Sequence, residues 1–147
     1  MAGIPELKRF FREAGSIDVD KTDVRRFREF VDERLDDLAL AGRDAAHWNG
    51  RDVIAPQDLP ITAGLQQQIR AFGKLEEADE LRQFLRGTVR RPPDDVTFGD
   101  ETDDVLVEVF GGLAVALARS FHLLDGHVTN PTTELWDRAF ELFRLLV

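Results

Sequence analysis

The sequence predicts an all-helical protein of one domain, residues 1–147, made of two similar halves joined near Gly73. Three observations predict this class. Apolar residues recur every three or four positions over long stretches, which is the period of an amphipathic helix. A short–long–short succession of such stretches occurs in residues 4–73 and again in residues 74–147. Finally, 43% hydrophobic and 32% charged residues are typical of a globular domain with a sizeable core.

The first half is expected to open with a short helix over residues 5–14, preceding a long one over residues 21–48. Gly15 ends the short helix, since glycine favours the left-handed stop conformation. Asp20 or Thr22 can cap the long helix by accepting a hydrogen bond from free backbone N–H groups. At about 42 Å, this helix is too long to bury its apolar stripe within a small three-helix unit.

The end of the first half is expected to hold a loop and a third helix. Asn49-Gly50 ends the long helix, and residues 51–54 form a short extended stretch. Pro56 and Pro60 then bracket the start of a helix that runs to Gly73.

The second half repeats this order. Residues 80–86 match residues 6–12 at four of seven positions. Asp100 or Thr102 can cap a second long helix that ends near Leu124, and a last helix completes the pattern. Because neither copy can bury its own long helix, we expect the two long helices to cross.

Gly111 and Gly112 lie at the midpoint of the second long helix. Each glycine there costs about 1 kcal/mol relative to alanine, so a compensating contact is expected. We expect the bare backbone to let the two long helices cross closely at their centres; a tolerated kink is the alternative.

The first half resembles the archaeal histones. Residues 49–59, with the sequence Asn-Gly-Arg-Asp-Val-Ile-Ala-Pro-Gln-Asp-Leu, resemble their second loop and third-helix start, and residues 7–15 resemble their first helix. The second half matches only in outline. Overall the chain is similar to an uncharacterised bacterial family of single-chain double histone folds. The resemblance implies an all-α architecture of two tandem histone folds, packed as an intramolecular handshake pseudodimer. It also implies that Arg51 and Asp58 form an internal ion pair between loop and helix.

The resemblance fails at the residues with which archaeal histones touch DNA. Their basic first-loop residue falls at Asp18 here, and their Lys-Thr pair falls at Asp52-Val53. The second half offers further carboxylates near its first loop, at Asp94, Asp95, Asp100 and Asp103. With a net charge of −9, the chain repels phosphate at long range. Histone-type DNA wrapping is therefore expected to be lost.

One concentration of basic residues could still contact nucleic acid. Residues 1–73 carry 11 basic and 13 acidic side chains, against 8 and 15 in residues 74–147. The basic residues concerned are Lys8, Arg9, Arg12, Lys21, Arg25, Arg26 and Arg28. The competing interpretation is a solvated helix face, because acidic residues are interleaved with them at pairing distance.

Several classes of site are not expected. There is no cysteine, which excludes disulfides and zinc–thiolate sites. The three histidines lack the spacing of metal or catalytic motifs, so we expect no metal, no cofactor and no enzymatic activity. The N-terminus does not resemble a signal peptide, and no uninterrupted apolar run reaches the length of a membrane span. A cytoplasmic protein without membrane contact is expected.

Two functions follow from these observations. The favoured one is a non-enzymatic histone-fold module for protein interaction or self-assembly, which would expose apolar residues such as Trp48, Trp136 or Phe30 to its partner. The alternative is a nucleoid-associated protein that binds DNA through the basic residues of the first half.

Overall fold

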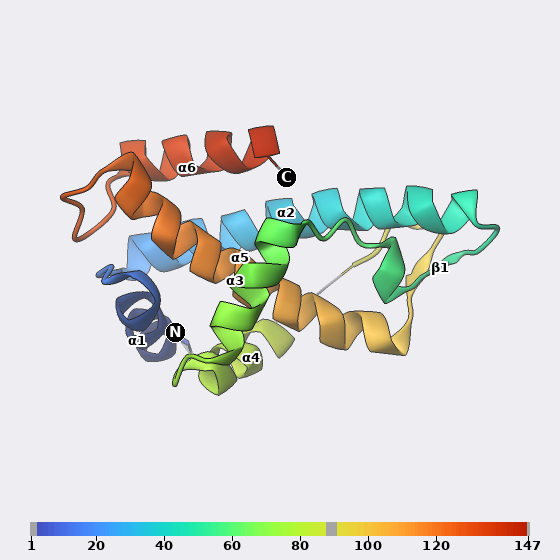
Figure 1. Ribbon diagram of the computed structural model, residues 1–147, viewed down its shortest axis with the longest axis horizontal. Helices are drawn as coiled ribbons and strands as arrows, with labels where there is room; N and C mark the ends of the chain where they lie inside the picture. Colours follow the sequence, from blue (N-terminus) through green and yellow to red (C-terminus); the bar gives the residue numbers. More distant parts are fainter. Residues whose placement is uncertain (1–2, 88–90, 147) are drawn as a thin grey trace.

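The computed structural model describes residues 3–87 and 91–146, and it is mostly helical, with a very small parallel sheet (Figure 1). Helix α5 lies in the middle of the view, with α2 behind it and α3 passing in front. In chain order the elements are α1 (Ile4–Gly15), α2 (Lys21–Trp48), β1 (Val53–Ile54), the 3-10 turn η1 (Pro56–Asp58), α3 (Ala63–Gly73), α4 (Ala78–Arg86), β2 (Thr97–Phe98), α5 (Asp100–Leu124) and α6 (Thr133–Leu146).

The first two helices agree with the sequence prediction in their positions, but Gly15 is the last helical residue of α1 and Ser16, at φ 55°, adopts the left-handed stop expected of the glycine. Of the two candidate caps, Asp20 is the residue that caps α2: its carboxylate accepts hydrogen bonds from the backbone N–H groups of Thr22 and Asp23. The Asp23 carboxylate in turn accepts from the Asp20 backbone N–H, which completes a capping box. The predicted apolar stripe of α2 faces the core, since Val24, Phe27, Val31, Leu35 and Leu38 are all buried.

The third helix begins later than its sequence suggests. Pro56 starts only the turn η1, and α3 begins at Ala63, where the Thr62 hydroxyl caps it by accepting from the Leu65 backbone N–H at 3.1 Å. A proline favours the first turn of a helix but does not make the turn continue, which is why the prediction started the helix too early.

The predicted caps of α5 are wrong. The N-cap position is Gly99, without a side-chain hydrogen bond, and Asp100 is the first helical residue. Thr102 is buried and its hydroxyl donates instead to the carbonyl of Ile54, at 2.6 Å. The side chain therefore joins the two halves of the chain rather than closing the end of its own helix.

Helix α5 forms the centre of the core. Buried side chains occur around its whole circumference, from Leu106 to Phe121, whereas α2 buries only one stripe. By length and composition α5 could span a bilayer, but 72% of its most apolar window is buried inside the fold. Helices α1, α3, α4 and α6 all pack against it, so it has the environment of a core helix.

Gly111 and Gly112 do permit a close helix crossing, but the predicted partner is wrong. A Cβ atom at Gly111 would lie 2.3 Å from the Phe72 ring, and one at Gly112 would lie 2.9 Å from the Ile69 backbone nitrogen. Both neighbours belong to α3, not to α2. The two glycines thus form the surface on which α3 crosses α5.

We expect Gly111→Ala and Gly112→Ala each to destabilise the protein by about 1–3 kcal/mol, because overpacking outweighs the helix propensity that alanine gains. Gly64→Ala is the matched control, since a Cβ there meets only the Thr62 hydroxyl at 4.0 Å. The measurement is urea unfolding followed by circular dichroism. Equal stability of all three variants would contradict the close crossing.

Candidate interaction surfaces and loop junctions

Loops from the two halves pair at both ends of the molecule. At one end, β1 and β2 run parallel, with Val53 opposite Thr97 and Ile54 opposite Phe98. At the other end, the Asp18 backbone N–H donates to the Thr129 carbonyl at 2.8 Å. Each junction therefore joins a loop of the first half to a loop of the second half.

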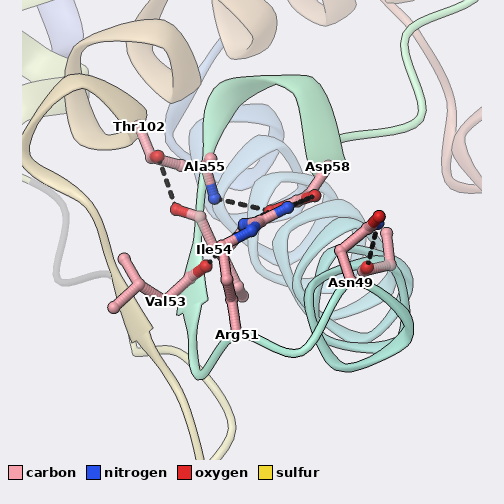
Figure 2. A network of polar contacts seen from close by, with 8 residues as sticks. Asn49, Arg51, Val53, Ile54, Ala55, Asp58 and Thr102 are labelled. Carbon is pink, nitrogen blue, oxygen red and sulfur yellow. Dashed lines mark hydrogen bonds and ion pairs between the residues drawn. The ribbon is translucent and has the colours of Figure 1, made fainter.

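Arg51 and Asp58 form a bidentate ion pair at the first junction (Figure 2). The two guanidinium Nη atoms lie 2.7 and 2.8 Å from the carboxylate oxygens of Asp58. Arg51 also donates to the Val53 carbonyl at 3.0 Å, and Asp58 accepts from the Ala55 backbone N–H at 2.7 Å. The ion pair that the resemblance implied is therefore present, and it ties the loop to the turn η1 rather than to the helix that follows.

The environment of Asp58 favours its ionised form. Its side chain is only 3% exposed, yet the hydrogen bonds from Arg51, together with the Ala55 N–H, hold the pKa of Asp58 below its ordinary value. Arg51 keeps about a third of its surface in solvent, with a side-chain exposure of 36%. Because both Nη atoms of Arg51 already bind the carboxylate of Asp58, few of its N–H groups are free to bind a phosphate.

Asp58→Asn is expected to lower the free energy of unfolding by about 2 kcal/mol at pH 7, since the buried site loses its charge-assisted bonds. A carboxyl whose pKa is depressed by folding stabilises the protein above its unfolded pKa of about 4 and loses this effect at lower pH. The pH dependence of stability below about pH 4 should therefore be flatter in the variant than in the wild type. Chemical unfolding from pH 3 to 7 measures this.

Asp52, an exposed residue of the same loop, provides the control for the Asp58 variant. Asp52→Asn removes one carboxylate of the same loop without touching the pair, and it should leave both stability and its pH dependence within about 0.5 kcal/mol of the wild type. If both variants behaved alike, the ion pair would not be the source of the effect.

Asp23 holds the second junction together, and its role was not predicted. This residue is 3% exposed. Its carboxylate accepts from the indole Nε1–H of Trp136 at 2.8 Å and from the side-chain amide of Asn130 at 3.0 Å. Asn130 also donates to the Asp18 carbonyl at 2.7 Å. The start of α2, the loop before α6 and α6 itself meet at this one carboxylate.

The electrostatics of Asp23 differ from those of Asp58. Burial raises the pKa of Asp23, and the hydrogen bonds from Trp136, the Asp20 backbone and Asn130 act in the opposite direction. No guanidinium is among these donors, so neutral N–H groups stabilise the carboxylate. The sequence signal was present, because Asp23 is the N3 residue of a capping box, but capping alone does not predict burial.

Asp23→Ala is expected to destabilise the protein by about 2–3 kcal/mol, since it leaves the buried indole N–H of Trp136 without its acceptor. Asp32→Ala, at an exposed position of the same helix, is the control and should change stability by at most about 0.5 kcal/mol. Thermal unfolding monitored by tryptophan fluorescence tests both. A small effect at Asp23 would mean that the junction is not held by its carboxylate.

The structure divides the predicted basic concentration between separate surfaces. Arg26 lies against α6, with its Nη2 2.6 Å from Asp137 and its guanidinium over the Phe140 ring. Arg28 lies against α4, over the ring of Phe84. Two residues that are close in sequence therefore point to different neighbours of α2, and the predicted cluster does not form one face.

The remaining basic residues are exposed, and two of them face carboxylates. Arg9 lies 3.4 Å from Glu77, and Arg12 lies 3.2 Å from Asp18. Lys8, Lys21 and Arg25 also lie at the surface. Nucleic-acid contact at these seven residues stays a prediction, although carboxylates neutralise several of them at close range.

The exposed apolar residues differ from those expected. Trp48 is 90% exposed at the end of α2, as the interaction hypothesis requires. Trp136 and Phe30, however, are each only 1% exposed. The Trp136 ring packs edge-on against Phe121, and Phe30 packs edge-on against Phe143, so both belong to the core. Their expected exposure was wrong because α6 covers this part of α2.

Metal ligation receives no support in the part of the chain that the structure describes. Within residues 3–87 and 91–146, no group of three or more histidine or carboxylate side chains is arranged to hold a metal ion.

Comparisons with known proteins place the chain among uncharacterised relatives. The sequence pattern of a family described as "Domain of unknown function (DUF1931)" matches residues 7–144. An uncharacterized protein of Aquifex aeolicus is 29% identical over 111 residues, which are 76% of this chain and 65% of that protein. A second one is 26% identical over 133 residues, covering 82% of this chain and 77% of its own length.

Solved structures share the fold over nearly the whole chain. A crystal structure of a protein from Thermus thermophilus has a TM-score of 0.81 at 35% identity and covers 97% of each chain. A crystal structure of a protein from Aquifex aeolicus has a TM-score of 0.81 at 25% identity, covering 99% of this chain and 95% of that one.

Proposed function

Since the chain belongs to the family described as a domain of unknown function (DUF1931), we propose a function from its own residues: it is a non-enzymatic module for protein interaction or self-assembly, built from two tandem histone folds. The two halves form an intramolecular handshake. It has lost the DNA wrapping of histones.

The arrangement of the two halves supports the handshake. Each half runs short helix, long helix, short helix, and each long helix is preceded and followed by a loop. The loop after α2 pairs with the loop before α5, and the loop before α2 pairs with the loop after α5. This reciprocal pairing supports the proposed handshake, in which a twofold axis would relate the two halves. The bidentate Arg51–Asp58 pair lies where the resemblance to archaeal histones places it.

The loss of DNA wrapping rests on one observation above all: carboxylates occupy the loop positions at which histones present basic residues. Asp18 is exposed and pairs with Arg12, which neutralises a cation next to it. Asp52 is exposed beside β1. At both positions a negatively charged carboxylate would repel the phosphates of DNA.

The absence of catalysis is part of the same proposal. The three histidines have structural or exposed positions, and each has different neighbours. His47 lies 3.4 Å from Asp95, His122 contacts the Gly15 carbonyl, and His127 is exposed beside Asp125. None of them adjoins a hydroxyl nucleophile in these contacts. A cysteine-free, acidic chain also suits the cytoplasm.

We expect no binding to a fluorescent duplex of about 40 base pairs at about 50 mM salt, where phosphate contacts are strongest. Fluorescence anisotropy measures this. An affinity that falls steeply as salt rises to about 200 mM would overturn the proposal and favour a nucleoid-associated protein.

A charge-reversed variant distinguishes DNA contacts made by basic residues of the first half from nonspecific binding. Lys21→Glu with Arg25→Glu alters two exposed residues of α2 and leaves Arg26, which packs on α6, in place. If the wild type bound DNA through the first half, this variant would lose the binding. A residual signal shared by both proteins would instead be nonspecific.

A further inference from the structure

An apolar groove lies where α3, α5 and α6 meet. It has a volume of about 380 Å³, and Leu65, Leu113, Ala116 and Phe143 contribute to its lining. Two exposed leucines stand among the lining residues: Leu123 of α5, 86% exposed, and Leu146 of α6, 70% exposed. Large apolar side chains exposed in this way beside an apolar hollow are typical of an interaction site.

The charge of the groove differs from that of the chain as a whole. The chain has 28 acidic residues, but no carboxylate lines the groove among the described residues. Its one charged lining residue there is Arg119, which donates to Gln68 at 2.7 Å and remains exposed. Helix α3, which forms one wall, contains Arg70 and no acidic residue. The groove therefore fits an apolar partner surface with negative charge.

Such a surface exists on the chain itself. Leu40, Asp44 and Trp48 are spaced by four residues and so follow one outward stripe of α2. Leu40 is 45% exposed and Trp48 is 90% exposed. Asp44 projects between them with a side chain that is 73% exposed, and its ion-pair neighbour within the described residues is the adjacent Arg43, at 3.3 Å. This stripe is the acidic, apolar counterpart of the groove.

We propose that the occupant of the groove is the Leu40–Asp44–Trp48 stripe of a second copy of this chain. Trp48 and Leu40 pack onto the apolar lining, and Asp44 lies near Arg119. Tryptophan is among the residue types that most often dominate such contacts. The inference rests on the proposed self-assembly and adds the two surfaces that carry it.

The stripe and the groove lie on different parts of the molecule. The stripe belongs to the last turns of α2, whose C-terminal end lies at the right of Figure 1, whereas residues of α3, α5 and α6 line the groove. Each copy therefore presents both surfaces, and a stripe-to-groove contact that is not closed by a twofold axis is head-to-tail. Such a contact continues from copy to copy and yields a ring or a chain.

Two variants separate the surfaces. Trp48→Ala removes the main residue of the stripe and leaves the groove intact. Leu123→Glu places a carboxylate in the groove and leaves the stripe intact. Both positions are exposed in the described fold, so the substitutions should not prevent folding, and circular dichroism checks this. Leu145→Glu is the matched control, because Leu145 is 83% exposed but does not line the groove.

The experiment is sedimentation velocity of the full chain over about 1–100 µM. The wild type and the Leu145 variant should associate with increasing concentration, and each of the other two variants should associate at least about tenfold more weakly. Mixed in equal amounts, the Trp48 and Leu123 variants should form a dimer and nothing larger, because each retains the surface that the other lacks.

Failure of this inference differs from failure of the proposed function. A monomeric wild type at all concentrations, or two variants that do not pair on mixing, would overturn the stripe-and-groove contact. Neither result would be evidence that the protein binds DNA. Salt-dependent retention of the DNA duplex would overturn the proposed function, whatever the sedimentation result.

Discussion

The fold depends on the contact of α3 with α5 at Gly111 and Gly112. Phe72 and Ile69, which belong to the first half, occupy the space that a side chain at either glycine would need. Since α5 buries residues around its whole circumference, it needs a neighbour on every side. The glycine pair lets α3 be the neighbour on one side of α5. At this distance between the two helices, a Cβ atom at either position would overlap α3. Burial of the most apolar helix is thereby shared between both halves of the chain.

Polar contacts then fix how the halves are aligned. Apolar packing is not directional and tolerates sliding, whereas a buried carboxylate accepts only from donors at defined positions. Asp23 accepts from α6 and the loop before it, and Ile54 accepts from Thr102 at the opposite end. The two junctions lie at opposite ends of α2, so together they fix both the position and the rotation of the halves.

Periodicity predicted the helices well because it reports which face is buried, and the bounds of α2 were predicted to the residue. Local patterns failed where a long-range contact decided the outcome. Thr102 has the sequence context of a cap but bonds to Ile54, and the glycine pair was assigned to the wrong neighbour. Burial of Trp136 depends on where α6 docks, which no local pattern encodes. The Arg51–Asp58 pair was expected from the resemblance of residues 49–59 to archaeal histones, and it is present.

The glycine pair also distinguishes the two halves from each other. When Asn49-Gly50 is aligned with Asp125-Gly126, the two glycines of α5 fall opposite Leu35 and Asp36 of α2. A dimer of identical chains must carry the same residue at both equivalent positions, so a glycine useful on one side would weaken the other. In a single polypeptide the two equivalent positions can carry different residues. In the proposed tandem arrangement the side chains of the two halves can therefore specialise, so that one half provides the glycine surface and the other provides the helix that packs on it.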